Sequence, residues 1–150
     1  MSEKQYVIFK LKNEEYGIEI TAVEEILKYQ EITKVPQADS YILGVVNIRG
    51  KVIPVYNLKK KFYGEDCQVT EETRIVVISF QQMSIGMIVD SVSEVLRIPN
   101  AQVDQTSAIF SEDCNKSISG IGKLANRLLM ILDISHLFSE KEKQVIQEVV

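Results

Sequence analysis

Short runs of alternating hydrophobic and polar residues, separated by polar turns, fill most of this chain and predict a fold made of β-strands. The clearest example is the stretch 44–58, where two runs rich in valine and isoleucine flank Arg49-Gly50-Lys51. This arrangement predicts a β-hairpin with a tight turn. Pro54 lies within the second run. Because proline has no backbone N–H, we expect this strand to lie at a sheet edge or to direct the proline nitrogen away from a neighbour.

An internal duplication extends this pattern over the whole chain. A predicted hairpin at residues 6–20 returns at an offset of 69 residues, which aligns Val7 with Val76, Gly17 with Gly86, Val23 with Val92 and Glu25 with Glu94. The hairpin at 44–58 returns at an offset of 76 residues, which aligns Ile42 with Ile118, Gly44 with Gly120, Val55 with Ile131 and Phe62 with Phe138. The second offset is longer by seven residues. We therefore predict an insertion in the polar run between Asn100 and Ser117.

The duplication predicts one domain, residues 1–150, with two pseudo-repeats at about 6–62 and 75–138. Each repeat supplies about five short strands and only brief helical pieces, which favours an all-β fold of small barrels over a parallel α/β sheet. Capping residues predict single helical turns near Thr21 and Ser91 and one or two helical turns after Asn57 and Asp133. Ser139 with Glu142 predicts a C-terminal helix at 139–150. Val145, Ile146 and Val149 form one apolar face of this helix. The face can pack on the body of the protein or on a partner, and we expect it to pack on the body.

The composition is that of an ordinary soluble globular protein, with 45% hydrophobic and 25% charged residues. No apolar run is long enough to span a membrane and no signal segment opens the chain, so we expect a cytoplasmic protein. The net charge of -4 is divided evenly between the two halves, which disfavours nucleic-acid binding. We interpret the one basic cluster, Lys59-Lys60-Lys61, as a solvated helix face.

Side chains suited to catalysis or to metal binding are sparse. Cys67 and Cys114 lack zinc-binding spacing and are interpreted as free thiols, and the one histidine, His136, is interpreted as structural. We therefore expect no catalytic residues, no cofactor and no metal. A small hydrolase would need a pocket with a perturbed acid or base, and the sequence offers no such pair. A β-barrel nucleic-acid-binding module is the alternative, but it needs exposed aromatic residues, and four are predicted to face the core: Tyr6, Phe9, Tyr16 and Phe80.

Five sequence motifs match those of a known family: Glu14-Glu15-Tyr16-Gly17-Ile18-Glu19-Ile20, Val23-Glu24-Glu25-Ile26, Gly44-Val45-Val46-Asn47-Ile48-Arg49-Gly50, Pro54-Val55-Tyr56-Asn57-Leu58 and Gly86-Met87-Ile88-Val89-Asp90-Ser91-Val92. On these motifs the chain, from about residue 6 to 138, resembles the CheW coupling proteins of bacterial chemotaxis and the homologous regulatory domain of the CheA kinase. Ile48 and Asn57 stand where family members usually have leucine and aspartate. The first difference conserves volume, and the second conserves a helix cap.

The resemblance implies two SH3-like five-stranded β-barrels that share a hydrophobic core and partly exchange chain segments. It implies a non-catalytic adaptor that joins the CheA histidine kinase, through its regulatory domain, to the cytoplasmic tips of methyl-accepting chemotaxis receptors and helps to assemble receptor arrays. We expect a free-standing coupling protein that is monomeric in isolation. We expect it in the cytoplasm at membrane receptor arrays, without membrane insertion and without nucleic-acid binding.

The resemblance also implies a set of protein-interaction residues: Val23, Glu25, Gly44, Asn47, Arg49, Ile75 and Gly86. In the family, the residue that matches Arg49 is tied to coupling and can pair with the acid that matches Glu25. Arg49 aligns with Ala125 in the duplication, which indicates that the fold does not need an arginine there. Glu25 aligns with Glu94, so a structural role and an interface role are both open for this glutamate.

Other positions in the motifs are explained at least as well by the backbone. Gly50 aligns with Asn126, and both residue types tolerate positive φ. Gly44 and Gly86 are glycines in both copies and can simply allow close backbone approach. The second copy lacks Asn47, Arg49 and Pro54, so we expect the adaptor function to be concentrated at those three positions.

Overall fold

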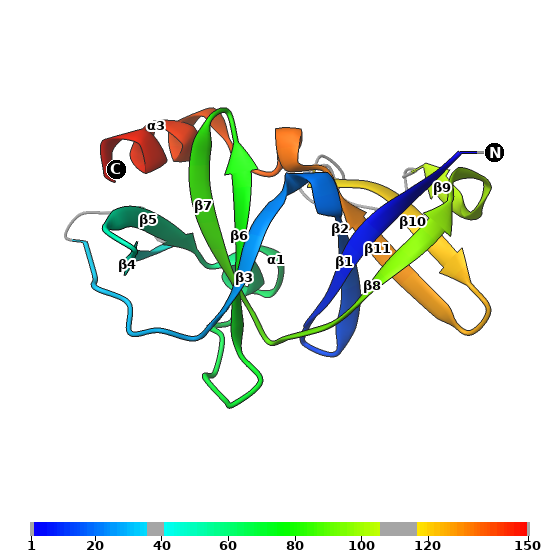
Figure 1. Cartoon of the computed structure of the whole chain (residues 1–150), viewed down its shortest axis with the longest axis horizontal. Helices are drawn as coiled ribbons and strands as arrows, with labels where there is room; N and C mark the ends of the chain where they lie inside the picture. Colours follow the sequence, from blue (N-terminus) through cyan, green and yellow to red (C-terminus); the bar gives the residue numbers. More distant parts are fainter. Residues whose placement is uncertain (1, 36–40, 106–116, 150) are drawn as a thin grey trace.

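The computed structural model of the chain describes residues 2–35, 41–105 and 117–149, and most of them lie in β-strands (Figure 1). The strands are β1 (Glu3–Leu11), β2 (Glu14–Glu19), β3 (Val23–Lys28), β4 (Ile42–Ile48), β5 (Lys51–Tyr56), β6 (Arg74–Phe80), β7 (Met83–Val89), β8 (Ser91–Pro99), β9 (Val103–Gln105), β10 (Ile118–Leu124) and β11 (Arg127–Leu132). The helical elements are α1 (Leu58–Tyr63), α3 (Glu140–Val149) and the 3-10 turns η1 (Ile20–Ala22), η2 (Asn100–Gln102) and η3 (Ile134–His136). Cys114 and most of the predicted insertion lie outside the described residues.

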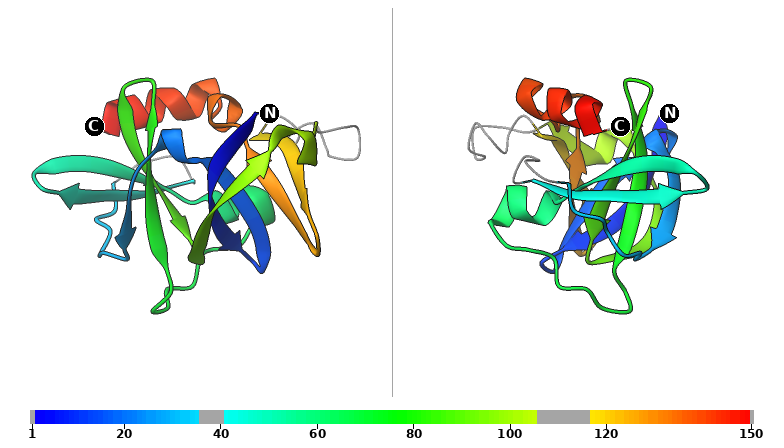
Figure 2. Two further views of the ribbon diagram at one scale, coloured as in Figure 1. Left: turned by 45° about the vertical axis from the view of Figure 1, so that its right-hand side comes forward. Right: turned by 90° about the vertical axis from the view of Figure 1, so that its left-hand side faces the viewer.

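The strands form two sheets that lie side by side and curl into two small barrels (Figures 1 and 2). The six-stranded sheet has the order β8-β1-β2-β11-β10-β9, and the five-stranded sheet has the order β3-β6-β7-β5-β4. The N-terminal hairpin β1–β2 therefore pairs with strands of the C-terminal half, and the hairpin β6–β7 pairs with strands of the N-terminal half. The predicted all-β, two-barrel fold is confirmed. The two barrels exchange hairpins, and the short β9 is a sixth strand in one of them.

The pairing register repeats from one half of the chain to the other. Val7 lies opposite Ile18 in β1–β2, and Val76 lies opposite Met87 in β6–β7. The hairpins β4–β5 and β10–β11 also share one register, including an irregularity near the start of β4 and of β10. Residues related by the two sequence offsets therefore occupy equivalent positions in space.

A core shared by both sheets holds the barrels together. Its largest cluster includes Phe9 and Tyr16 from the six-stranded sheet and Tyr56 and Phe80 from the five-stranded sheet, all at least 94% buried. Two smaller clusters fill the separate barrels. Burial on this scale supplies the main stabilising free energy of the fold. The prediction from the sequence that Tyr6, Phe9, Tyr16 and Phe80 face the core is confirmed, because all four are buried.

Gly44 lies where two backbone segments come too close together for any side chain. Residue Thr33 bridges to Val45 through two backbone hydrogen bonds of 2.8 and 2.9 Å. A Cβ atom at Gly44 would lie 2.1 Å from the Thr33 carbonyl oxygen. Gly120 is in the equivalent position, where a Cβ atom would lie 2.7 Å from the backbone oxygen of Asp104 in β9. Close backbone approach therefore explains the glycine in both copies.

Pro54 is not on an edge strand, because β5 lies between β4 and β7. It lies opposite Val45, and both backbone polar groups of Val45 are directed to Thr33 instead. Val45 and Pro54 therefore form a non-hydrogen-bonded residue pair of the antiparallel ladder, and such a pair needs no N–H from the proline. The edge-strand prediction was wrong, and the alternative, a nitrogen directed away from the β4 neighbour, is confirmed.

The helical elements largely follow their predicted caps. Asn57 accepts a hydrogen bond from the Lys60 N–H at the start of α1, and Asp133 caps η3. η1 is the single turn expected near Thr21. The turn expected at Ser91 is absent from the described chain, because Ser91 begins β8 and pairs with Lys10 of β1. Pairing along β1 therefore overrides the local capping preference.

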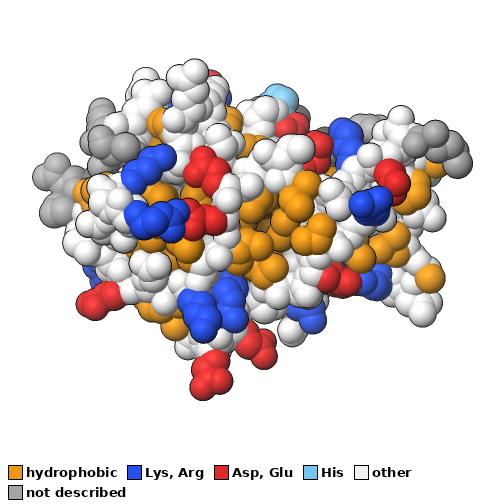
Figure 3. Space-filling view, in the orientation of Figure 1, with side chains coloured by type: hydrophobic (Ala, Val, Ile, Leu, Met, Phe, Trp, Pro, Cys, Tyr) orange, Lys and Arg blue, Asp and Glu red, His pale blue; other side chains and the backbone are white. Residues whose placement is uncertain are grey.

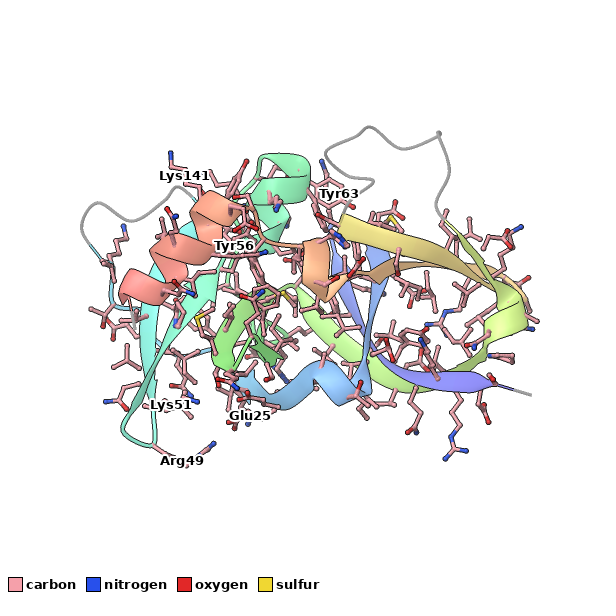
Figure 4. The ribbon with its side chains drawn as sticks, turned by 90° about the horizontal axis from the view of Figure 1, so that it is seen from above. Glu25, Arg49, Lys51, Tyr56, Tyr63 and Lys141 are labelled. Carbon is pink, nitrogen blue, oxygen red and sulfur yellow. The ribbon has the colours of Figure 1, made fainter. Side chains whose placement is uncertain are left out.

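The C-terminal helix α3 packs on the body, as expected. Ile146 is fully buried in the shared core, and Val145 packs against it. The predicted capping box is present, with hydrogen bonds of 2.8 and 3.1 Å between Ser139 and Glu142. The same Glu142 carboxylate accepts a hydrogen bond from the hydroxyl of Tyr56, which lies beside α3 in Figure 4. A buried carboxylate therefore joins α3 to the end of β5.

The basic cluster is not a solvated face. Lys59 pairs with Asp90 at 3.2 Å, and Lys61 pairs with Glu142 at 3.3 Å. The side chains of Lys59 and Lys61 are mostly buried, while Lys60 is more exposed. The interpretation as a solvated helix face was therefore wrong, because two of the three lysines are partners for carboxylates on other elements.

Asp90 is the centre of a polar cluster between β7 and β8. Its carboxylate accepts hydrogen bonds from the Lys12 backbone N–H (2.8 Å), the Cys67 thiol (3.2 Å) and the Lys59 ammonium (3.2 Å). Burial alone raises the pKa of Asp90, but these bonds outweigh it and hold the pKa below its usual value. Burial and the bond to Asp90 raise the pKa of the Cys67 thiol to about 12, so this thiol is protonated at neutral pH.

We predict that Gly44→Ala lowers the free energy of unfolding by about 3 kcal/mol or more, because the new methyl group collides with backbone atoms that cannot move aside. The matched control is Gly50→Ala, where φ is 84° but no atom lies within 4 Å of the added carbon. That change should cost about 1 kcal/mol. Urea unfolding of both variants measures the difference, and equal losses would show that steric contact at Gly44 is not the cause.

The lowered pKa of Asp90 makes stability depend on pH. A carboxyl group whose folded pKa lies below its unfolded value of about 3.9 contributes stability above that pH and loses it as the pH falls toward the folded pKa. Asp90→Asn should therefore lower the free energy of unfolding at pH 7, by about 1–3 kcal/mol for hydrogen bonds to a charged group, and by less at pH 3. Urea unfolding at both pH values tests this, and a loss of the same size at both would contradict it.

Candidate protein-interaction site

The turn between β4 and β5 holds its two central residues in the left-handed region. Arg49 has φ 52° and Gly50 has φ 84°, and the Asn47 side-chain oxygen accepts a 2.8 Å hydrogen bond from the Gly50 N–H. Two consecutive positive φ values are the geometry of a type I′ hairpin turn. The prediction of positive φ is confirmed for Gly50. Asn126, its counterpart in the duplication, is not among the described residues with positive φ.

Arg49 forms an ion pair with Glu25 across the open side of the five-stranded barrel. The guanidinium nitrogen lies 2.6 Å from the Glu25 carboxylate, and the two side chains are 73% and 28% exposed. Figure 4 shows Arg49 at the tip of the β4–β5 turn and Glu25 on β3. An exposed pair of this kind contributes little to stability. Because most of the Arg49 side chain is exposed, it can contact another protein.

The other barrel contains an equivalent glutamate that pairs with a different arginine. Glu94 of β8 lies 2.8 Å from Arg127, which also forms two hydrogen bonds to Glu15. The Arg127 side chain is only 33% exposed. Hydrogen bonding to Arg127 lowers the pKa of the Glu15 carboxyl group. The hydrogen bonds to Glu15 and Glu94 raise the pKa of the Arg127 guanidinium. Arg127 therefore acts as a fixed bridge between β11, β2 and β8.

The alignment alone missed this relation, because Arg127 aligns with Lys51 and not with Arg49. Both barrels pair the repeated glutamate with an arginine, but the arginine comes from different positions of the equivalent hairpins. Lys51 instead donates a 2.8 Å hydrogen bond to Ser84, whose hydroxyl donates to Glu24. The pairing of Glu25 is thus part of the repeated architecture, while the exposed position of Arg49 is special to the first half.

Exposed apolar side chains also occupy equivalent positions in the two barrels. Ile26 of β3 is 41% exposed, and its counterpart Val95 of β8 is 47% exposed. Val52 of β5 is 42% exposed, and its counterpart Leu128 of β11 is 66% exposed. Figure 3 shows further hydrophobic surface along the junction of the two sheets. Sequence analysis did not single out these four residues, although strand alternation places each of them on an outward face.

The remaining predicted interaction residues do not share one surface. Asn47 is exposed beside Arg49, and Val23 is half-buried at the start of β3. Gly44 and Gly86 are buried, and Ile75 is fully buried. A Cβ atom at Gly86 would lie 2.8 Å from the Ile75 side chain, so these two residues pack together inside the barrel. The predicted contact between Ile75 and a partner is therefore not available to its side chain, because the side chain does not reach the surface.

Within the described ranges, no group of three or more metal-ligating side chains is present. Within the same ranges, no helix is long and apolar enough to cross a membrane. The single histidine, His136, is exposed and pairs with Asp133 at 2.7 Å.

Comparison with known proteins gives a consistent family. The CheW-like domain family matches residues 5–142. The chain is 34% identical to the chemotaxis protein CheW of Klebsiella aerogenes over 97% of this chain and 88% of that protein, and 33% identical to the chemotaxis protein CheW of Bacillus subtilis over 94% and 90%. The crystal structure of the scaffolding protein TtCheW from Thermoanaerobacter tengcongensis is also similar, with a TM-score of 0.84 and 31% identity over 95% of this chain and 92% of that one.

These similarities confirm the resemblance seen in the sequence and the SH3-like character of the two barrels. They also agree with a non-catalytic scaffold role and not with an enzyme. Both the match to the family and the identities extend over nearly the whole chain. The chain therefore belongs to the CheW-like domain family of chemotaxis scaffold proteins.

Proposed function

We propose that this protein is a coupling adaptor that connects methyl-accepting chemotaxis receptors to the CheA histidine kinase and helps to assemble receptor arrays in the cytoplasm. Family membership supports the proposal, since the relatives are chemotaxis proteins and one is a scaffolding protein. An adaptor of this kind needs at least two separate contact surfaces on one rigid body. The shared core, which joins the two barrels, supplies that rigidity.

The observation that carries the proposal is the repetition of surface features on both barrels. Each barrel exposes two large apolar side chains at equivalent positions, and each has a glutamate–arginine pair in the same sheet. Exposed apolar groups that recur at the same structural position favour protein contact over chance exposure. Two such surfaces on one body suit a protein that binds two partners at once.

Arg49 is the proposed specificity residue of the five-stranded barrel. It lies at a turn tip beside Asn47, it is mostly exposed, and Glu25 holds its guanidinium in place. Arginine at the margin of an apolar surface is common in interfaces, because the planar guanidinium can form several hydrogen bonds to a partner carboxylate or carbonyl. We assign Val23 to the same surface, and we assign Ile75 and the buried glycines the role of shaping the strands beneath it.

Binding to the kinase is tested by calorimetric titration of the isolated CheA regulatory domain into this protein. The proposal predicts a saturable complex, with apolar burial seen as a negative heat-capacity change. The same titration is repeated with single-stranded DNA, which should give no salt-dependent binding. Absence of a complex with the kinase domain at high micromolar concentration would contradict the proposal.

Arg49→Ala should weaken binding to the kinase domain or to a receptor fragment at least tenfold, while changing stability by about 0.5 kcal/mol or less. Arg127→Ala should instead cost about 1–3 kcal/mol of stability, since it leaves Glu15 and Glu94 without their shared partner. Thermal unfolding and titration are measured on the same samples. A large loss of stability in Arg49→Ala with unchanged binding would show that Arg49 acts structurally.

The matched control for charge is Lys12→Ala. Lys12 forms an exposed ion pair with Glu65 at the β1–β2 turn, and its backbone bond to Asp90 does not need the side chain. Removing this positive charge should leave binding to the kinase domain and binding to the receptor fragment unchanged. Equal weakening by Lys12→Ala and Arg49→Ala would mean that net charge, and not the Arg49 surface, controls binding.

A further inference from the structure

A polar cavity opens at one end of the six-stranded barrel. It has a volume of about 530 Å³ and is bounded by β1, β2, η1, β10 and the segment that leads into η3. Cavities of this size fall in the range used for small ligands, and the mouth of a β-barrel is a common place for them. Polar residues from distant parts of the sequence line it, among them Lys4, Tyr6, Glu19, Thr21, Ser119 and Asp133.

The hydroxyl of Tyr6 is the unusual feature of this cavity. The Tyr6 side chain is only 4% exposed, and no described residue forms a hydrogen bond with it. Buried polar groups in proteins nearly always have a hydrogen-bond partner, so a phenol that lines a cavity and lacks a protein partner is suited to a ligand. Burial and the neighbouring Glu19 raise the pKa of Tyr6, so the hydroxyl keeps its proton and can donate it.

The duplication shows that the fold does not require these polar groups. At an offset of 69 residues, Lys4, Tyr6 and Glu19 align with Thr73, Ile75 and Ile88 of the other barrel. Ile75 and Ile88 are buried in an apolar cluster there. An aliphatic side chain therefore satisfies the position of Tyr6, and the phenol, the ammonium and the carboxylate are additions found in one barrel only.

The charges around the cavity limit what it can hold. Lys4 and Glu19 lie 3.7 Å apart, with side chains about half exposed, so each can also contact a ligand. Asp133 is already used by the Ser135 backbone and by His136, at 3.1 and 2.7 Å. A simple anion would meet the two carboxylates, and a simple cation would meet Lys4. A molecule that carries both charges meets a partner for each.

We propose that this cavity binds a small zwitterion of amino-acid or dipeptide size. Its carboxylate accepts hydrogen bonds from the Tyr6 hydroxyl and the Lys4 ammonium, and its ammonium group lies against the Glu19 carboxylate. Thr21 and Ser119 also line the cavity, and the Ser119 hydroxyl donates a 3.4 Å hydrogen bond to the Ile131 carbonyl oxygen. Because the cavity is separate from the Arg49 surface, this inference does not depend on the proposed coupling function.

The test is an NMR titration of the full chain, with backbone amide shifts followed while single free amino acids and simple dipeptides are added to about 10 mM. We expect at least one of them to cause saturable shifts at residues around the cavity, among them Tyr6, Glu19 and Ser119. Its N-acetylated and its amidated forms, which each lack one charge, should bind at least tenfold more weakly. No saturable shift with any probe, or equal binding of the blocked forms, would overturn the proposal.

Two variants place the binding in the cavity without disturbing the fold. Tyr6→Phe removes only the hydroxyl, and an aromatic ring still fills the core, so melting should be unchanged while binding falls at least tenfold. Glu19→Gln should remove the preference for a free ammonium group. Titration with the CheA regulatory domain should be unaffected by either variant. Unchanged zwitterion binding in both variants would show that the ligand binds elsewhere and would overturn the assignment.

Discussion

The structure depends on two parallel strand contacts that join hairpins from different halves of the chain. In the five-stranded sheet, Val55 of β5 lies opposite Gly86 of β7, and in the six-stranded sheet Ile131 of β11 lies opposite Gly17 of β2. Each contact consists of two residue pairs, and one pair of each contact includes a glycine. A Cβ atom at Gly86 would approach the Ile75 side chain to 2.8 Å, and one at Gly17 would lie 3.3 Å from Ile131. Gly17 therefore leaves room for Ile131 across the contact between the two halves, whereas Gly86 leaves room for Ile75 of its own hairpin.

This exchange explains why the two barrels behave as one body. Neither repeat can complete a sheet with its own strands, so the shared core forms only when both hairpins have crossed over. The C-terminal helix then covers the same core through Ile146, and Glu142 joins it to β5 through Tyr56. Surfaces on the two barrels are consequently held in a fixed relation. That relation is what a scaffold needs in order to position two partners relative to each other.

Much of this architecture could be predicted from the sequence, because an internal duplication repeats the same pattern of hairpins in both halves of the chain. Two constant offsets identified the hairpins and their equivalence in the two halves, and caps at Asn57 and Ser139 identified the helix starts. Features that depend on contacts between distant segments could not be predicted. Pro54 can lie inside a sheet because Thr33 takes the hydrogen bonds of Val45. Two of the lysines of α1 are mostly buried, because they pair with Asp90, between β7 and β8, and with Glu142 of α3.

The candidate site shows the same division. The pairing of Arg49 with Glu25 was expected, and the chain brings them within 2.6 Å. The Arg127 bridge was missed because an equivalent interaction can be made from a different sequence position when a neighbouring side chain is long enough to reach the same acid. The burial of Ile75 was missed because a family motif records which positions matter and not whether they touch a partner or support one that does.

The central claim is that one rigid body binds two partners at the same time. Sedimentation velocity of this protein with the CheA regulatory domain and a receptor cytoplasmic fragment, alone in pairs and then together, tests it most directly. A rigid adaptor with two separate contact surfaces should form two binary complexes and a larger ternary complex that contains all three proteins. Displacement of one partner by the other, with no ternary species at saturating concentrations, would contradict it.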